Sequence, residues 1–249
     1  MSGYFEAWAN QIRWSIGPAE RDLMRRVTEV VQRDLRGNVY WAGSQAKGTA
    51  IMGSDLDMCI QTPEPVTEAQ RRLLAGGLRA ALGRPAEPKL HVVRMAAHGS
   101  APRVDIAFAH AAFGSRPLPD VSEFKGRNAR QQAARALKFW ARGGGLPPVG
   151  GWALEKVVVH LDAREHAHGL GLVVDAVDWL ADRANPAAIE ALLRPVATPR
   201  WQPIWSEKLP GRLEALKNAA RALRSRYRPD GWRSIGDVER WVRGQSGAR

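Results

Sequence analysis

The sequence contains one cysteine, no long apolar run and fewer acidic than basic residues. The single thiol, Cys59, excludes an internal disulfide and a cysteine-rich zinc module. No stretch approaches the roughly 18 consecutive apolar residues of a membrane-spanning helix, so we expect no membrane partner. The N-terminus lacks a basic segment followed by an apolar one, so we expect no signal peptide. These absences predict a protein of the reducing cytoplasm.

What the sequence does contain is an ordinary globular composition with a strong positive charge. Its 249 residues, 45% hydrophobic and 25% charged, suffice for one large domain or two modest ones. The formal net charge is +12, and the basic residues are seven lysines and 30 arginines. Arginine binds phosphate groups bidentately, so we expect at least loose binding of polyanions. Because the arginines are spread along a chain rich in alanine and glycine, a compositional bias explains the charge equally well, and RNA as an activator or acceptor stays an open interpretation.

Two aspartates, Asp55 and Asp57, lie in a run that alternates as a half-buried strand does. Side chains two apart on a strand share a face, so both aspartates point one way while Leu56, Met58 and Ile60 point into a core. Neighbouring carboxylates repel each other unless a cation lies between them. Mg²⁺ takes oxygen ligands and commonly binds through one or two carboxylates plus substrate phosphates. The pattern therefore predicts a metal-nucleotide site.

A glycine-serine turn precedes these aspartates and follows a short predicted strand, residues 39–42. At Gly43 a phosphate can approach the backbone closely, and the amide and hydroxyl of Ser44 can donate hydrogen bonds to it. A third carboxylate, Asp105, stands on the exposed side of a second alternating run, residues 103–108. Three strand-borne carboxylates suit a two-metal phosphoryl-transfer centre with ions roughly 3.5–4 Å apart. Taken singly, the turn is a common loop and the aspartates are a solvated strand edge or a weak calcium site; their conjunction favours the catalytic interpretation.

A family resemblance rests on these motifs. Residues 42–44, then ten residues, then Asp-Leu-Asp-Met at 55–58 resemble the signature of the DNA polymerase β-type nucleotidyltransferase superfamily, with Asp105 at the third carboxylate. Gly-Thr-Ala-Ile at 48–51 is most similar to the branch of 2′-5′-oligoadenylate synthetases and bacterial cGAS/DncV-like nucleotidyltransferases (CD-NTases). Residues 136–155, with Ala-Leu-Lys-Phe-Trp, Leu-Pro-Pro and Trp-Ala-Leu-Glu, resemble the helical half of oligoadenylate synthetases. The resemblance implies an α+β fold, with a small mixed-sheet, palm-like core, a C-terminal all-helical lobe and an active site in the cleft between them.

The resemblance also implies roles for the motif residues. Gly43 and Ser44 would hold the β/γ-phosphates of a nucleoside triphosphate, with ATP as the expected donor. Asp55 and Asp57 would bind the metal ion that bridges the triphosphate. Asp105 would complete the site of the second of two Mg²⁺ or Mn²⁺ ions and help to take the proton of the acceptor hydroxyl.

Two residues of the helical half are added by the same resemblance. Lys138 stands where relatives have a lysine that reaches the triphosphate, although a solvated helical lysine has similar weight. Trp152 stands near a Tyr or Ser-Tyr of relatives that lies by the base and phosphates, but the glycines before it depart from that pattern. Glu155 is expected to be a structural partner of an arginine. His166 and His168 are expected at the surface, because two residues apart on a helix they face different directions.

The pattern along the chain predicts two domains: residues 1–125 for catalysis and residues 126–249 as a helical lobe that binds nucleotide or substrate. Strand and turn signals occur in the first half only. A loop is expected over residues 113–125. The expected helices are residues 3–16, 19–35, 67–82, 128–142, 152–167, 170–184, 208–227 and 235–242, and the expected strands are 39–42, 54–60, 89–97 and 103–109.

The predicted reaction is transfer of a nucleoside monophosphate from an NTP to a hydroxyl, with release of pyrophosphate. A nucleotide as acceptor, giving cyclic or linear oligonucleotide signals, is favoured by residues 48–51 and 146–148. An RNA or tRNA end, as in CCA-adding or poly(A)-type enzymes, is favoured by the basic charge, which disfavours a small molecule or protein side chain. A non-catalytic nucleotide- or RNA-binding relative is the remaining alternative. The sequence leaves the base preference, linkage and oligomeric state open.

Overall fold

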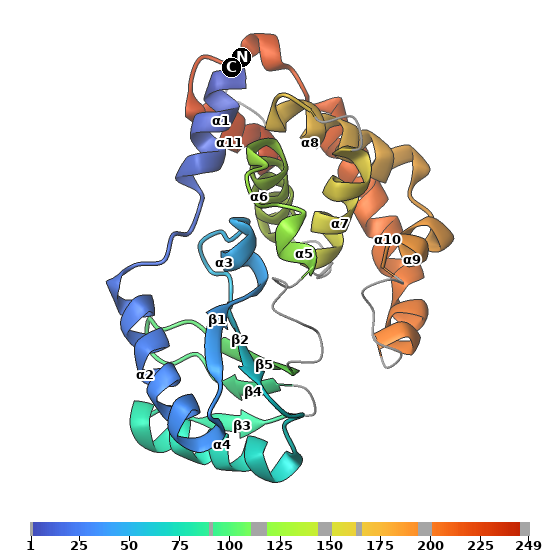
Figure 1. Ribbon diagram of the computed structural model, residues 1–249. Helices are drawn as coiled ribbons and strands as arrows, with labels where there is room; N and C mark the ends of the chain where they lie inside the picture. The colour runs from blue at the N-terminus through green and yellow to red at the C-terminus, as the bar shows by residue number, and fades with distance from the viewer. Residues whose placement is uncertain are drawn as a thin grey trace. The chain divides into compact units, whose positions relative to one another are not determined.

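The computed structural model describes residues 2–89, 92–110, 119–143, 151–162, 166–193 and 201–244, and the fold is α+β as expected. The chain divides into two compact units (Figure 1). The sheet unit is Trp14–Lys125, and the helical unit combines Met1–Arg13 with Gly126–Arg249. The N-terminal helix thus groups with the C-terminal helices, and the division into domains at residues 125 and 126 stays a proposal.

The sheet unit is built on five strands in the order β1-β2-β5-β4-β3. β2 and β5 are parallel, and the other three neighbouring pairs are antiparallel. The sheet is therefore mixed, with its parallel ladder in the interior. The strands are β1 (Asn38–Trp41), β2 (Leu56–Thr62), β3 (Ala86–Pro88), β4 (Val92–Met95) and β5 (Val104–His110).

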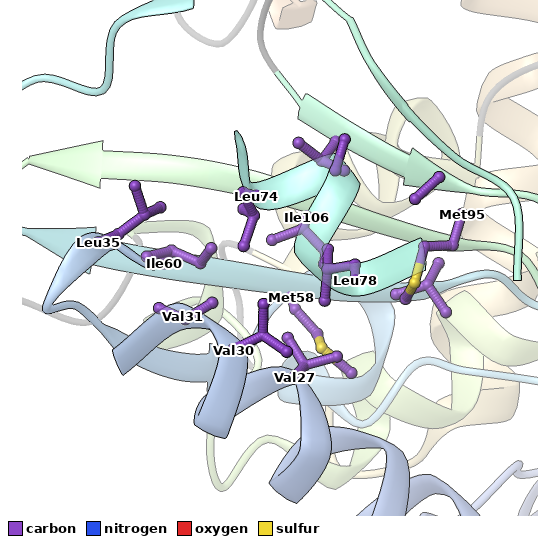
Figure 2. Close-up of a cluster of buried hydrophobic side chains, with 14 of the residues drawn as sticks. Val27, Val30, Val31, Leu35, Met58, Ile60, Leu74, Leu78, Met95 and Ile106 are labelled. Atoms are coloured by element: carbon purple, nitrogen blue, oxygen red, sulfur yellow. The ribbon is translucent and has the colours of Figure 1, made fainter. Parts of the chain in front are cut away.

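Two helices, α2 (Pro18–Leu35) and α4 (Glu68–Leu82), pack on one face of this sheet (Figure 2). Pro18 occupies the first turn of α2, and Thr67 caps α4 by accepting a hydrogen bond from the backbone of Gln70. The core contains every second strand residue, and each fully buried aliphatic side chain contributes about 1.5–3 kcal/mol. The alternate residues are left on the opposite face, which these helices do not cover. The core comprises Val27, Val30, Val31, Leu35, Leu56, Met58, Ile60, Leu74, Ala75, Leu78, Ala86, Val93, Met95, Val104 and Ile106.

The helical unit holds its N-terminal helix through an aromatic contact and a buried arginine. The rings of Trp8 and Phe139 meet edge to face, with centroids 5.4 Å apart. Arg135 donates from Nε to the carbonyl of Ala9 at 2.7 Å, and burial, followed by the charge of Arg13, lowers its pKa to about 10. The helices are α1 (Ser2–Gln11), α6 (Asn128–Gly143), α7 (Gly151–Leu161), α8 (Gly169–Asp178) with a π-helical turn (Trp179–Arg183), α9 (Pro186–Leu193), α10 (Trp201–Ser225) and α11 (Ile235–Val242).

Several expected boundaries are corrected by the structure. The first helix ends at Gln11 rather than at residue 16, and the strand expected over 89–97 shrinks to β4. β3, α9 and the short helix α5 (Pro119–Ser122) were not expected. β3 ends at Pro88 and has only three residues, so it is too short to show an alternating pattern in the sequence. In the described part of the chain, no helix is both long enough and apolar enough to cross a bilayer.

Candidate active site

The open face of the sheet brings Asp57 and Asp105 side by side. β2 and β5 are parallel and pair residue by residue, so Asp57 stands opposite Asp105. Both lie on the face opposite α2 and α4, because the apolar residues on either side of them are buried in the core. Paired strands are about 4.8 Å apart, so the two carboxylates are direct neighbours. The expectation that Asp105 lies beside the first aspartate strand is confirmed.

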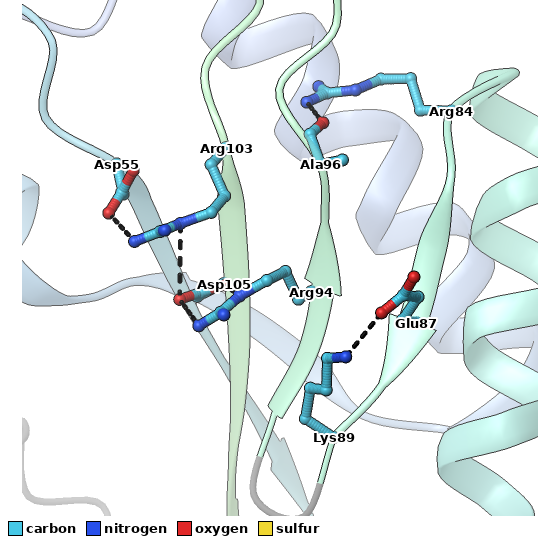
Figure 3. Close-up of polar contacts among 8 residues, drawn as sticks. All are labelled: Asp55, Arg84, Glu87, Lys89, Arg94, Ala96, Arg103 and Asp105. Carbon is cyan, nitrogen blue, oxygen red and sulfur yellow. Dashed lines mark hydrogen bonds and ion pairs between the residues drawn. The ribbon is translucent and has the colours of Figure 1, made fainter.

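Asp55 lies just before β2 and is linked to Asp105 through an arginine. It lies one residue before β2, where the amide of Leu56 donates to the carbonyl of Arg103 at 2.9 Å. The guanidinium of Arg103 bonds to the carboxylate of Asp55, and its Nε lies 4.0 Å from Oδ2 of Asp105. Asp55 is thus joined to the pair across β2 and β5 by a shared cation (Figure 3).

Gly43 lies directly against Asp57. The amide of Ala42 donates to the carbonyl of Asp57 at 2.8 Å, and Gly43 then adopts φ +52° as the first residue of the short helix α3 (Gly43–Lys47). A Cβ atom at Gly43 would lie 1.9 Å from Oδ2 of Asp57. Only glycine fits here, because both the backbone conformation and the space exclude a side chain. The expected glycine-serine turn is therefore a helix start, and Ser44 follows within its first turn.

The segment between α3 and β2 is fixed by its own hydrogen bonds. The amide of Thr49 donates to the carbonyl of Ser44 at 2.9 Å, and Ser54 donates from its amide to the carbonyl of Ile51 at 2.9 Å. In return, the hydroxyl of Ser54 accepts from the amide of Ile51 at 3.2 Å. Thr49, Ile51 and Ser54 are buried. This bonded segment sets the position of Asp55.

Arg94 is the site residue that sequence reasoning missed. It stands opposite Asp105 across the antiparallel pair β4 and β5, and it donates from Nε and Nη2 to the two carboxylate oxygens at 2.7 and 2.9 Å. These bonds raise the pKa of Arg94 above its ordinary value, and burial opposes them. The alternation Val93-Arg94-Met95 would have placed Arg94 on the open face, but its partner depended on the register of the β4–β5 hairpin.

The residues present fit a divalent cation by donor type, because Asp55, Asp57 and Asp105 offer oxygen ligands from one sheet face. They are not gathered into a ready cluster. Within the described ranges, no three His, Cys, Asp or Glu side chains are placed to hold a metal ion together. Asp55 and Asp105 are bound to arginines instead.

Cys59 lies near the aspartates on β2 without sharing their chemistry. It is buried, and it pairs in register with Tyr40 of β1. Burial raises the pKa of its thiol. Cys59 is thus a packing residue rather than a reactive thiol.

The sites expected in the helical half lie on α6 and α7. Lys138 is buried on α6 and pairs with Glu155 of α7, and a Cβ atom at Gly151 would lie 2.9 Å from Cε of Lys138. The glycine before Trp152 therefore makes room for this lysine stem. Trp152 is half-buried at the second position of α7. The expected Leu-Pro-Pro stretch, residues 146–148, lies outside the described residues.

The two histidines have carboxylate partners. His166 lies between Asp162, at 3.1 Å from Nδ1, and Asp175, at 2.9 Å from Nε2. Burial lowers the pKa of His166, but the hydrogen bonds to Asp175 and Asp162 together raise it above the ordinary value. His168 is exposed and lies 3.0 Å from Glu6.

Comparisons with known proteins point to the same unit of the chain. Residues 23–107, which include Gly43, Ser44 and the three aspartates, match the family described as "Nucleotidyltransferase domain". No curated protein sequence is significantly similar to the chain.

Solved structures show the same fold over nearly the whole chain. The E. coli MS115-1 CdnC:HORMA-deltaN complex has a TM-score of 0.64 at 17% identity, covering 98% of this chain and 96% of CdnC. Cid1 poly(U) polymerase bound to MgATP has a TM-score of 0.69 at 11% identity, covering 98% of each chain. The GLD-2/RNP-8 complex has a TM-score of 0.62 at 12% identity, covering 90% of this chain and 100% of the matched one. At these identities the likeness establishes the fold.

Proposed function

We propose that this chain, whose residues 23–107 match the nucleotidyltransferase-domain family, is a nucleotidyltransferase of the DNA polymerase β type. It would move a nucleoside monophosphate from an NTP to a hydroxyl with the help of divalent cations. The observation that carries the proposal is the in-register pair Asp57 and Asp105, with Gly43 against Asp57. This arrangement places two carboxylates beside the backbone at the start of α3. A triphosphate and its cations need both elements.

The residues of the sheet unit divide the work. Asp55, Asp57 and Asp105 would hold two Mg²⁺ or Mn²⁺ ions, which neutralise the charge that develops on the phosphates. Gly43 and Ser44 would receive the β/γ-phosphates at the start of α3, where backbone N–H groups have no acceptor within the helix.

The protein contributes little covalent chemistry to this reaction. The acceptor oxygen forms a bond to the α-phosphorus, and the bond from that phosphorus to the bridging oxygen of pyrophosphate breaks. Asp105 would accept the proton of the acceptor hydroxyl. Most of the rate enhancement then comes from alignment of the two reactants.

We propose a nucleotide as the acceptor, giving cyclic or linear oligonucleotide signals. Gly-Thr-Ala-Ile at residues 48–51 supports this, as does the match to CdnC along almost the entire length of both chains. An RNA end is the second candidate, supported by the net charge of +12 and by the match to a poly(U) polymerase. A role of RNA as an activator is compatible with a nucleotide as the acceptor.

One experiment tests both the reaction and the acceptor. The full chain is incubated with each labelled NTP and Mg²⁺ or Mn²⁺, with and without double-stranded RNA or tRNA, and pyrophosphate and labelled products are measured. Small phosphatase-resistant products support the nucleotide acceptor, and label on the RNA supports the RNA end. Nucleotide binding without pyrophosphate release would contradict catalysis.

Matched variants assign the chemistry to the site. Asp57→Asn and Asp105→Asn are each expected to lower turnover about a thousandfold, because metal-bound charge supplies several kcal/mol. Glu68→Gln is the control, since Glu68 is an exposed carboxylate of the same unit that pairs with Arg72 on α4. Full turnover in either aspartate variant would overturn the assignment.

A further inference from the structure

Both oxygens of Asp105 are engaged by one arginine. Arg94 donates two hydrogen bonds to them from the neighbouring strand (Figure 3). Such a bidentate pair is the strongest common form of arginine-carboxylate contact. The two residues are paired in the strand register, so the backbone itself sets Arg94 beside Asp105.

A second arginine forms an ion pair with Asp55. Arg103 bonds to Asp55 and lies within 4.0 Å of Asp105. Two guanidinium groups thus supply positive charge to the carboxylates from which the proposed metal site is built. They relieve the repulsion that such neighbouring carboxylates exert on each other.

We infer that Arg94 occupies the cation position at Asp105 in the resting chain, and that a divalent cation binds there only when Arg94 is displaced. This inference rests on the proposed function. A guanidinium and a divalent cation on one carboxylate repel each other strongly at a separation of about 4 Å. Asp105 therefore exchanges one cation for the other rather than holding both.

The surroundings of Arg94 permit this exchange. Its side chain is 42% exposed on the open face of the sheet, and its long stem allows the guanidinium to move into solvent. Because water solvates the guanidinium as it leaves the carboxylate, a divalent cation can compete with Arg94 for Asp105. The arginines therefore raise the cation concentration at which the site fills.

The direct test is Mn²⁺ binding to the nucleotide-free full chain, measured by electron paramagnetic resonance. Arg94→Gln is expected to bind Mn²⁺ about tenfold more tightly than the wild type, because the competing charge-assisted bonds are gone. Arg94→Lys is expected to lie between them, since lysine cannot bond both oxygens in the same way. Arg72→Gln, which removes one positive charge from an exposed pair with Glu68 on α4, is expected to leave the affinity unchanged.

Folding of each variant is checked by thermal melting with and without Mn²⁺, and Arg103→Gln provides the same test at Asp55. Folded Arg94→Gln and Arg103→Gln proteins whose Mn²⁺ affinity is unchanged or weaker would overturn the inference. The proposed function would then stand if Asp57→Asn still abolished binding. Absence of Mn²⁺ binding in the wild type and in both arginine variants would overturn the inference alone, because the proposed function is tested separately by pyrophosphate release in the presence of nucleotide.

Discussion

In the sheet unit, Arg94 and Asp105 pair on an open face with side chains 42% and 18% exposed, whereas Lys138 and Glu155 of the helical unit pair with only 8% and 4% exposed. The exposed pair can separate because water replaces each lost contact. In the buried pair water cannot take this part, because both side chains are shielded from solvent. An ion pair in the sheet unit can therefore exchange its cation, whereas the ion pair in the helical unit is a fixed part of the packing.

This difference bears on Lys138, which the family resemblance placed at the triphosphate. A role there requires the ammonium group to leave Glu155 or to be shared with it. The arginines beside the aspartates face no such requirement. The proposal for Lys138 thus carries a larger energetic cost than the proposal for the sheet face.

A substitution at Gly43 is expected to disrupt the open face, with the largest loss of turnover among variants that change no charge. Gly43→Ala places a Cβ atom onto the carboxylate of Asp57 and strains a backbone with φ +52°. We expect turnover to fall by a factor of about 100, since displacing a reactive group by about 1 Å has that effect. Gly83→Ala is the matched control, because φ is +63° there and no atom lies within 4 Å. Equal activity of the two variants would show that Gly43 does not position Asp57.

The second effect breaks the buried pair. Glu155→Gln removes the charge that faces the buried ammonium group of Lys138, and we expect a loss of about 3–5 kcal/mol in the free energy of unfolding, measured by urea denaturation. The double variant Lys138→Met with Glu155→Leu should recover most of the lost free energy of unfolding. Glu87→Gln, at an exposed pair of the sheet unit, should leave the urea midpoint close to that of the wild type. A midpoint for Glu155→Gln that matches Glu87→Gln would remove the contrast between the units.

The smallest effect is a pH dependence confined to the helical unit. The raised pKa of His166 means that the folded chain binds this proton more tightly than the unfolded chain does. The stabilisation is therefore complete below the ordinary value of 6.5 and is lost as the pH rises through the higher folded value. We expect the melting temperature to decline over that range and the decline to shrink in His166→Gln. His168→Gln, on an exposed ring, is the control, and an identical pH profile in both variants would contradict the assignment.

The sheet positions of the aspartates followed from local sequence alone. Alternating apolar residues placed Asp57 and Asp105 on the face opposite the core, and the structure agrees. A shift of one residue in the strand register would move the apolar side chains out of the core, so burial of one face fixes the register. The helix cap at Thr67 was likewise readable from its own neighbours.

What the sequence did not indicate depends on contacts between distant segments. The bond from Arg94 to Asp105 requires the pairing of β4 with β5, and the Lys138–Glu155 pair joins two helices. The role of Gly43 was expected toward phosphate, whereas in the structure its missing side chain accommodates Asp57. Such relations are properties of the assembled fold, and no local pattern encodes them.

The parallel pairing of β2 with β5 also determines when the site forms. Asp57 and Asp105 are 48 positions apart in the chain, and α4, β3 and β4 lie between their strands. Joining such distant segments costs loop entropy that no nearby contact offsets, so this ladder is expected to close late in folding. A chain that has completed its antiparallel pairs but not this ladder would contain most of its secondary structure, but Asp57 and Asp105 would not yet be neighbours.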